Sequence, residues 1–165
     1  MNKGAFKSLI AGIAFGLFAI QSMAATDTVL VTGTVASVLT VSADTSGGGN
    51  SFTITPGVAV TSQALATINI NSNSPTGYDV TLTGTHATSV LQDSGSNTIA
   101  YTATYNGGSA QSITTTATNV ESSTSTTSGS VGRSLTLDIG AGASVGKPAT
   151  VGGYTDTITV EILAK

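Results

Sequence analysis

The sequence contains no cysteine and no tryptophan, and it has one histidine and three prolines among 165 residues. Without cysteine there is no disulfide, thiolate nucleophile or thiolate metal ligand, so packing and hydrogen bonds must hold the fold. His86 has no second histidine or cysteine with which to share a catalytic or metal site, so a solvated loop residue is its plainer interpretation. The sequence therefore predicts no enzyme, no catalytic residue, no cofactor and no metal site.

Basic residues are scarce, and two of the five lie at the N-terminus. Lys3 and Lys7 precede an apolar run over residues 9–20, and small residues follow this run. This order of zones predicts a signal peptide, residues 1–24, with cleavage before Ala25. The apolar run is shorter than the roughly 18 to 20 residues that span a bilayer. We therefore expect a secreted protein with no membrane span after cleavage.

Cleavage would leave 141 of the 165 residues, which is enough for one domain with a proper core. This remainder has three basic residues against eight acidic ones, a net charge of −5. Nucleic acids and anionic membranes require a basic patch, so neither is an expected partner.

Serine, threonine and glycine are abundant, and β-branched residues alternate with apolar ones through the rest of the sequence. About eight short strands with turn signals between them, and no helical period, predict an all-β antiparallel sandwich. An Asn-Gly-Gly sequence at residues 106–108 predicts a tight hairpin, and residues 114–132 predict a long surface excursion that has room for an edge strand. We expect strands at residues 38–42, 51–55, 66–71, 78–83, 99–105, 133–139 and 154–163.

The first alternating stretch after the signal covers residues 28–35. Val29, Val31, Gly33 and Val35 fall on one face of an extended strand, because i, i+2 and i+4 side chains point the same way. A glycine inside a strand weakens it unless another backbone or side chain must come close. The pattern therefore raises the question of what this strand packs against.

This stretch resembles the N-terminal donor strand of chaperone–usher pilins, whose alternating apolar residues are interrupted by a glycine. The Gly-Gly-Tyr-Thr-Asp-Thr-Ile-Thr-Val run at residues 152–160 is similar to the closing strand of the archaic, spore-coat-U-like branch. The Thr-Gly-Tyr-Asp-Val run at 76–80 is similar to a strand start in the same group. The chain lacks the cysteine pair that many classical members carry, so the archaic and the cysteine-free α-type branches both stay open.

The resemblance implies an incomplete immunoglobulin-like sandwich, residues 38–165, that is completed by a strand donated from residues 25–37. The donor residues would be Val29, Val31 and Val35, with Gly33 at the narrow point. The strand that faces the acceptor groove, or a chaperone, would carry Tyr154, Ile158, Val160 and Ile162.

The implied function is that of a structural subunit of a surface fibre, a pilus or fimbria that serves adhesion or biofilm formation. Its partners would be copies of itself in a head-to-tail homopolymer, a periplasmic chaperone and an outer-membrane usher. It would reach the cell surface through the periplasm.

Two alternatives remain open on the residues alone. Residues 28–41 could be the first strand of a self-contained secreted sandwich, an adhesive or carbohydrate-binding module, although four tyrosines and no tryptophan offer little for sugar stacking. The Asp-Ser-Gly-Ser-Asn loop at residues 93–97 places oxygens at alternate positions, as a calcium loop does. We prefer an Asx-type turn there, because these are also the common turn residues.

Overall fold

The computed structural model describes residues 30, 32–46, 49–127, 129–147 and 153–165. It divides the chain into two units, residues 1–34 and 35–165. In the first unit the described residues are exposed and belong to no strand, and the Leu30 side chain is 87% exposed. The described part of the second unit contains ten strands and one short 3-10 helix, and its helical content includes nothing long and apolar enough to cross a membrane. The elements are β1 (Leu39–Asp44), β2 (Val60–Ser72), β3 (Tyr78–Thr83), β4 (Val90–Gln92), β5 (Thr98–Ala100), β6 (Thr102–Tyr105), β7 (Ala110–Gln111), β8 (Thr118–Ser123), β9 (Val131–Ile139), η1 (Ala141–Ser144) and β10 (Thr159–Ala164).

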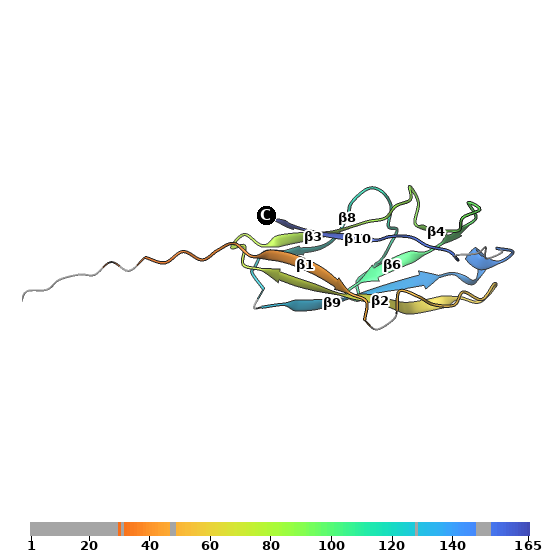
Figure 1. Cartoon of the computed structure of the whole chain (residues 1–165), viewed down its shortest axis with the longest axis horizontal. Coiled ribbons are helices and arrows are strands. Elements are labelled where there is room, and N and C mark those ends of the chain that lie inside the picture. The colour runs from red at the N-terminus through yellow and green to blue at the C-terminus, as the bar shows by residue number, and fades with distance from the viewer. Residues whose placement is uncertain (1–29, 31, 47–48, 128, 148–152) are drawn as a thin grey trace, which may run out of the picture. The chain divides into compact units, whose positions relative to one another are not determined.

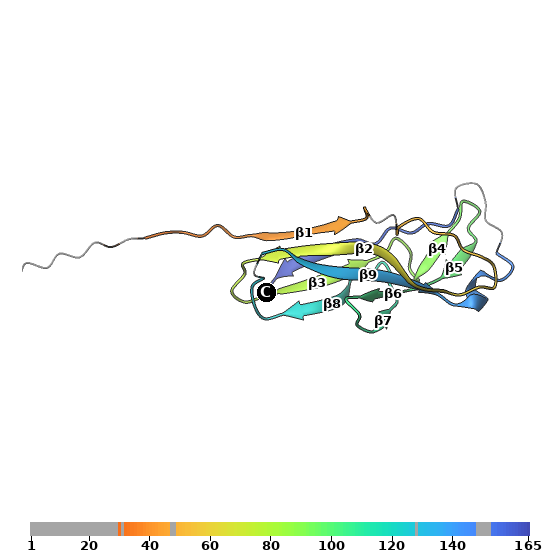
Figure 2. The ribbon, with the colours of Figure 1, turned by 90° about the horizontal axis from the view of Figure 1, so that it is seen from below.

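The strands of the second unit form an antiparallel sandwich, as the sequence predicts (Figures 1 and 2). One sheet has the order β1-β2-β9-β6-β7 and the other has the order β10-β3-β8, while β4 and β5 form a separate hairpin. The core lies between the two sheets and is built from both, with Ile68 and Leu137 contributed by the first and Val80 and Leu82 by the second. Every ladder between the described strands is antiparallel.

The alternation of β3 illustrates why these residues form a half-buried strand. Tyr78, Val80 and Leu82 are buried, whereas the residues between them are half-exposed. Successive side chains point to opposite faces of a strand, so the apolar set enters the core and the hydroxylated set meets water. The hairpin at 106–108 is also confirmed, since Asn106 (φ 49°) and Gly107 (φ 70°) take the left-handed conformation that the turn requires.

Four predicted strands differ from the structure in their extent. The strand predicted at residues 66–71 is the second half of the longer β2, which begins at Val60. Residues 51–55 form no ladder, and the chain before them is held by a hydrogen bond from the Gln63 side-chain amide to the Gly49 carbonyl. The predicted strand 99–105 is two strands, since the chain leaves the β4–β5 hairpin at Tyr101 and joins the larger sheet. The last strand is shorter than predicted and begins at Thr159, although the residues before it are extended.

The predicted surface excursion at 114–132 contains β8, which lies at the edge of the three-stranded sheet. The apolar alternation in the sequence predicts the ends of several strands wrongly, but it predicts burial correctly. Phe52 and Ile54 pack against the core without belonging to a strand. Apolar periodicity therefore predicts which side chains are buried better than it predicts which backbone groups are paired.

Candidate functional site

Two neighbouring edge strands define the candidate site. β1 pairs with β2 and β10 pairs with β3, and each strand ends its sheet among the described strands. β1 and β10 lie close together, yet they belong to different sheets and share no ladder (Figure 1). The backbone groups on the facing edges of these two strands are therefore available for pairing.

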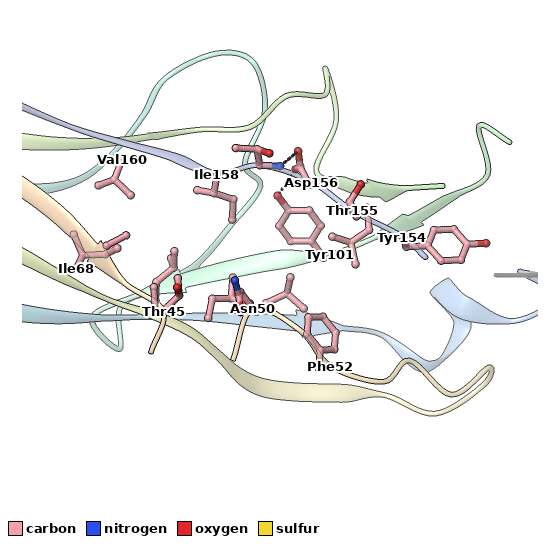
Figure 3. Close-up of a pocket in the computed structure, with 17 residues that line it drawn as sticks. Thr45, Asn50, Phe52, Ile68, Tyr101, Tyr154, Thr155, Asp156, Ile158 and Val160 are labelled. Atoms are coloured by element: carbon pink, nitrogen blue, oxygen red, sulfur yellow. Dashed lines mark hydrogen bonds between the residues drawn. The ribbon is translucent and has the colours of Figure 1, made fainter. Parts of the chain in front are cut away.

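An apolar hollow opens beside these edges, between the point where β1 ends and the point where β10 begins (Figure 3). Its volume is about 360 Å³. Its floor consists of core side chains, among them Ile68, Tyr101 and Leu137, which are at most 4% exposed. Phe52 and Tyr154 line one end of the hollow. We call the hollow together with the free edges of β1 and β10 the groove.

Three of the four predicted groove-facing residues line the hollow. Tyr154, Ile158 and Val160 do so, and Figure 3 shows Ile158 and Val160 pointing across it toward the layer that holds Ile68. Ile162 lies further along β10, where it is half-buried and packs against the core without lining the hollow. The intervening side chains of this segment are exposed, so the predicted two-residue alternation is confirmed here.

The predicted donor residues are placed only in part. Val29 and Val31 lie outside the described residues. Gly33 is exposed, and the position that a Cβ atom would occupy there has no neighbour within 4 Å. Val35 is exposed over 89% of its surface. A large apolar side chain that is left this exposed next to a strand start is a candidate for contact with another surface.

Asp156 is the polar member of the groove, and sequence reasoning gave it no role. It lies on the inward face between Tyr154 and Ile158, and its side chain is 2% exposed. Its carboxylate accepts hydrogen bonds from the Tyr101 hydroxyl (2.6 Å) and the Thr85 hydroxyl (2.5 Å). These bonds, together with the antiparallel bridge between Thr155 and Gln92, hold the segment before β10 in place, and Figure 3 shows the bond to Tyr101.

The environment of Asp156 favours the charged carboxylate. Burial raises its pKa, but the hydrogen bonds from Thr85, Tyr101 and the Thr157 N–H outweigh burial and hold the pKa below its ordinary value. His86 lies at the margin of this cluster, with Nε2 3.9 Å from the Asp156 carboxylate. Burial raises the pKa of Tyr101, and its hydrogen bond to the Asp156 carboxylate raises that pKa further.

We expect the Asp156→Asn substitution to cost stability at neutral pH and little in acid. A carboxylate whose folded pKa is depressed stabilises the fold above its unfolded pKa of about 3.9, and this contribution disappears as the pH falls through the folded pKa. The cost at pH 7 should be about 1.5–3 kcal/mol, the usual worth of hydrogen bonds to a charged group. Urea unfolding of wild type and variant at pH 7 and in strong acid measures the difference.

Glu161→Gln, on the outward face of β10, is the matched control and should leave the unfolding free energy unchanged at both pH values. An Asp156→Asn cost that is equal at neutral and acidic pH would contradict the assignment of a stabilising charge.

A second polar cluster joins the two sheets away from the groove, and the sequence analysis missed it as well. Arg133 of β9 donates to both carboxylate oxygens of Glu121 on β8, at 3.0 and 2.9 Å. The hydroxyls of Tyr78 and Tyr105 donate to the same carboxylate at 3.0 and 2.7 Å. The guanidinium holds the pKa of Glu121 below its usual range. The cluster therefore joins β8, the edge of the three-stranded sheet opposite β10, to β9 and β6 of the larger sheet.

The loop at residues 93–97, which resembles a calcium loop in sequence, has a structural role. The Asp93 carboxylate accepts hydrogen bonds from the Gly95 and Asn97 N–H groups and from the Asn97 amide, so the predicted Asx-type turn is confirmed. Among the residues that the structure describes, no group of three histidine, aspartate or glutamate side chains is arranged to hold a metal ion. A comparison with protein-family models finds no match to this chain, and a comparison with curated proteins finds none either.

Proposed function

We propose that this protein is a secreted fibre subunit whose sandwich is completed by the N-terminal strand of another copy. The observation that carries the proposal is the groove, in which two edge strands flank an apolar hollow that reaches core side chains. A strand placed there would pair with a free edge and fill the hollow with alternate side chains. Residues 28–35 supply such a strand.

The energies are sufficient for a stable contact. Burying three valine side chains at roughly 1.5 kcal/mol each contributes about 5 kcal/mol, before the ladder hydrogen bonds and the cost of ordering the segment. The contact is heterologous, since the donor surface differs from the acceptor surface. Repeated from one copy to the next, it does not close and builds a filament.

The proposal extends to the route of assembly. The signal peptide expected at residues 1–24 would deliver the chain to the periplasm and then to the cell surface. An open groove with free edges is prone to aggregation before assembly. A periplasmic chaperone that occupies the groove and an outer-membrane usher that exchanges it for the next subunit would meet this need. Adhesion or biofilm formation would be the role of the fibre.

Electron microscopy of the purified chain beginning at Ala25 tests the proposal. We expect thin fibres that grow with time and concentration. A protein that stays a stable monomer under all conditions would refute the proposal and favour a self-contained secreted module. That module is the weaker candidate, because it gives the groove and the exposed valine at position 35 no role.

Gly33 provides a more specific test of close approach in the groove. In the free subunit a side chain at position 33 meets open space, and Gly33 is not among the glycines with a left-handed backbone. We therefore expect Gly33→Val to leave the melting temperature of the monomer unchanged. In the groove the added bulk should cost about 1–3 kcal/mol and slow fibre growth roughly tenfold or more.

Thr34→Val is the matched control, because it places the same side chain on the other face of the same strand and adds almost no bulk there, since threonine and valine are nearly equal in size. Growth can be followed by light scattering. Equal growth of the Gly33→Val and Thr34→Val proteins would show that no surface approaches Gly33 closely.

A further inference from the structure

An exposed apolar patch lies at one end of the sandwich. Val58 is 54% exposed and Val145 is 60% exposed, and a Cβ atom at Gly57 would lie 3.9 Å from a Val145 methyl group, so the loops that carry the two valines are adjacent. The Ser144 hydroxyl accepts a hydrogen bond from the Gly57 N–H at 3.1 Å and donates to the Thr55 carbonyl at 3.4 Å. These bonds hold the two loops together. We call this end the Val58 pole.

The chain enters the sandwich at the opposite end. The Asn73 amide donates to the Ala36 carbonyl at 2.6 Å, and the Val38 N–H donates to the Asn73 side-chain carbonyl at 2.7 Å. Asn73 follows the end of β2, whereas Val58 precedes its start. The thirteen residues of β2 span about 40 Å at roughly 3.3 Å per residue, and this length separates the two ends. We call the second end the Asn73 pole.

The direction of a donated strand follows from β10. The ladder of Ala164 with Tyr78 and the hydrogen bond from the Lys165 N–H to the Gly77 carbonyl show that β10 runs toward the Asn73 pole. An added strand that pairs antiparallel with β10 runs from the Asn73 pole to the Val58 pole, which is also the direction of β1, because Leu39 at the start of β1 pairs with Ser72. The last residues of the donor segment then arrive at the Val58 pole of the acceptor.

No flexible linker separates the donor strand from the donor's own sandwich. Val35 is the last proposed donor residue, and the next residue, Ala36, is fastened to Asn73 of the donor's own sandwich. Consecutive residues span at most about 3.6 Å each. The Asn73 pole of the donor must therefore rest against the Val58 pole of the acceptor.

We infer that the patch formed by Val58 and Val145 is the docking site for a second copy of this chain, which binds there through its Asn73 pole. The inference rests on the proposed function. The docking pole presents Pro75 and Thr76, both exposed, at the turn after β2. The opposite strand direction would bring the donor to the acceptor's Asn73 pole, where the acceptor's own N-terminal segment leaves. Only a donated strand that runs antiparallel to β10 keeps the acceptor's own N-terminal segment clear for the next subunit.

Engineered cysteines test this contact sharply, because the natural chain has no thiol. The full chain from Ala25 that carries Val58→Cys and Ser74→Cys is assembled and treated with a short bis-maleimide. We expect a ladder of covalent oligomers on a denaturing gel. Thr126→Cys gives a second position at the Asn73 pole, since the Thr127 N–H donates to the Ser72 carbonyl.

The matched control pairs Val58→Cys with Ser109→Cys, which lies in the β6–β7 hairpin away from both poles and should give no ladder. Fibres that form but do not cross-link through either pair would overturn the docking inference alone. Dimers of a Ser74→Cys single variant within fibres would overturn it in favour of the opposite strand direction. Absence of any polymer would refute the proposed function and, with it, the inference.

Discussion

Replacing both Val31 and Val35 with aspartate in the chain that begins at Ala25 is expected to abolish fibre formation and leave a folded monomer. Each carboxylate would have to enter an apolar hollow without a partner, which costs several kcal/mol. A loss of about 4 kcal/mol in one contact already weakens it roughly a thousandfold. The monomer should be unaffected at position 35, because that side chain is 89% exposed.

The matched control places the same two charges on the other face of the same segment. Thr32→Asp with Thr34→Asp keeps the net charge and the backbone propensity of the first variant almost unchanged. It should still form fibres, because these side chains would point out of the groove. Negative-stain microscopy and sedimentation of each protein measure the outcome. Loss of fibres in both variants would mean that charge, rather than the apolar face, decides assembly.

The sequence predicts the layers of this fold well, because each layer depends on local alternation. β3 and β9 were predicted within two residues at each end, since their inward residues must be apolar to enter the core. Pairing is less predictable. Residues 51–55 alternate as a strand does, yet they form no ladder, because pairing also requires a partner strand that no local pattern reports.

The candidate site was also predictable only in part: its apolar face follows from the sequence, and its hydrogen-bond partners do not. The apolar residues Tyr154, Ile158 and Val160 were predicted to share a face, and all three line the hollow. Asp156 shares that face, and an inward acidic residue was a signal that it has buried donors. The identity of these donors could not be predicted, because Thr85 and Tyr101 are distant from Asp156 in the sequence.

The polar clusters explain how a groove can stay open in a folded subunit. Glu121 and Arg133 join β8 of one sheet to β9 of the other, while Asp156 ties the segment before β10, which forms one wall of the hollow, to Tyr101. Both clusters consist of charge-assisted hydrogen bonds, which hold more strongly than neutral ones. Under the proposed function, these contacts hold the groove in shape before a strand from another copy enters it.

A peptide that corresponds to residues 25–37 is expected to bind the Val31→Asp, Val35→Asp monomer and raise its melting temperature. That monomer retains an intact groove and lacks a competent donor of its own. A ligand at a hundred times its dissociation constant adds about 2.7 kcal/mol to the free energy of unfolding. For a domain of this size the shift is roughly 5–10 °C.

The same measurement separates donation between molecules from insertion of the segment into its own groove. Self-insertion predicts that the double variant alone loses at least about 3 kcal/mol of stability, the contribution of the two replaced valines at roughly 1.5 kcal/mol each. Donation predicts no such loss, together with stabilisation by the wild-type peptide and none by a peptide that carries the two aspartates. Calorimetry of the wild-type and variant chains, each with and without either peptide, distinguishes the two. A destabilised variant would assign the segment to its own molecule and remove the basis for a fibre.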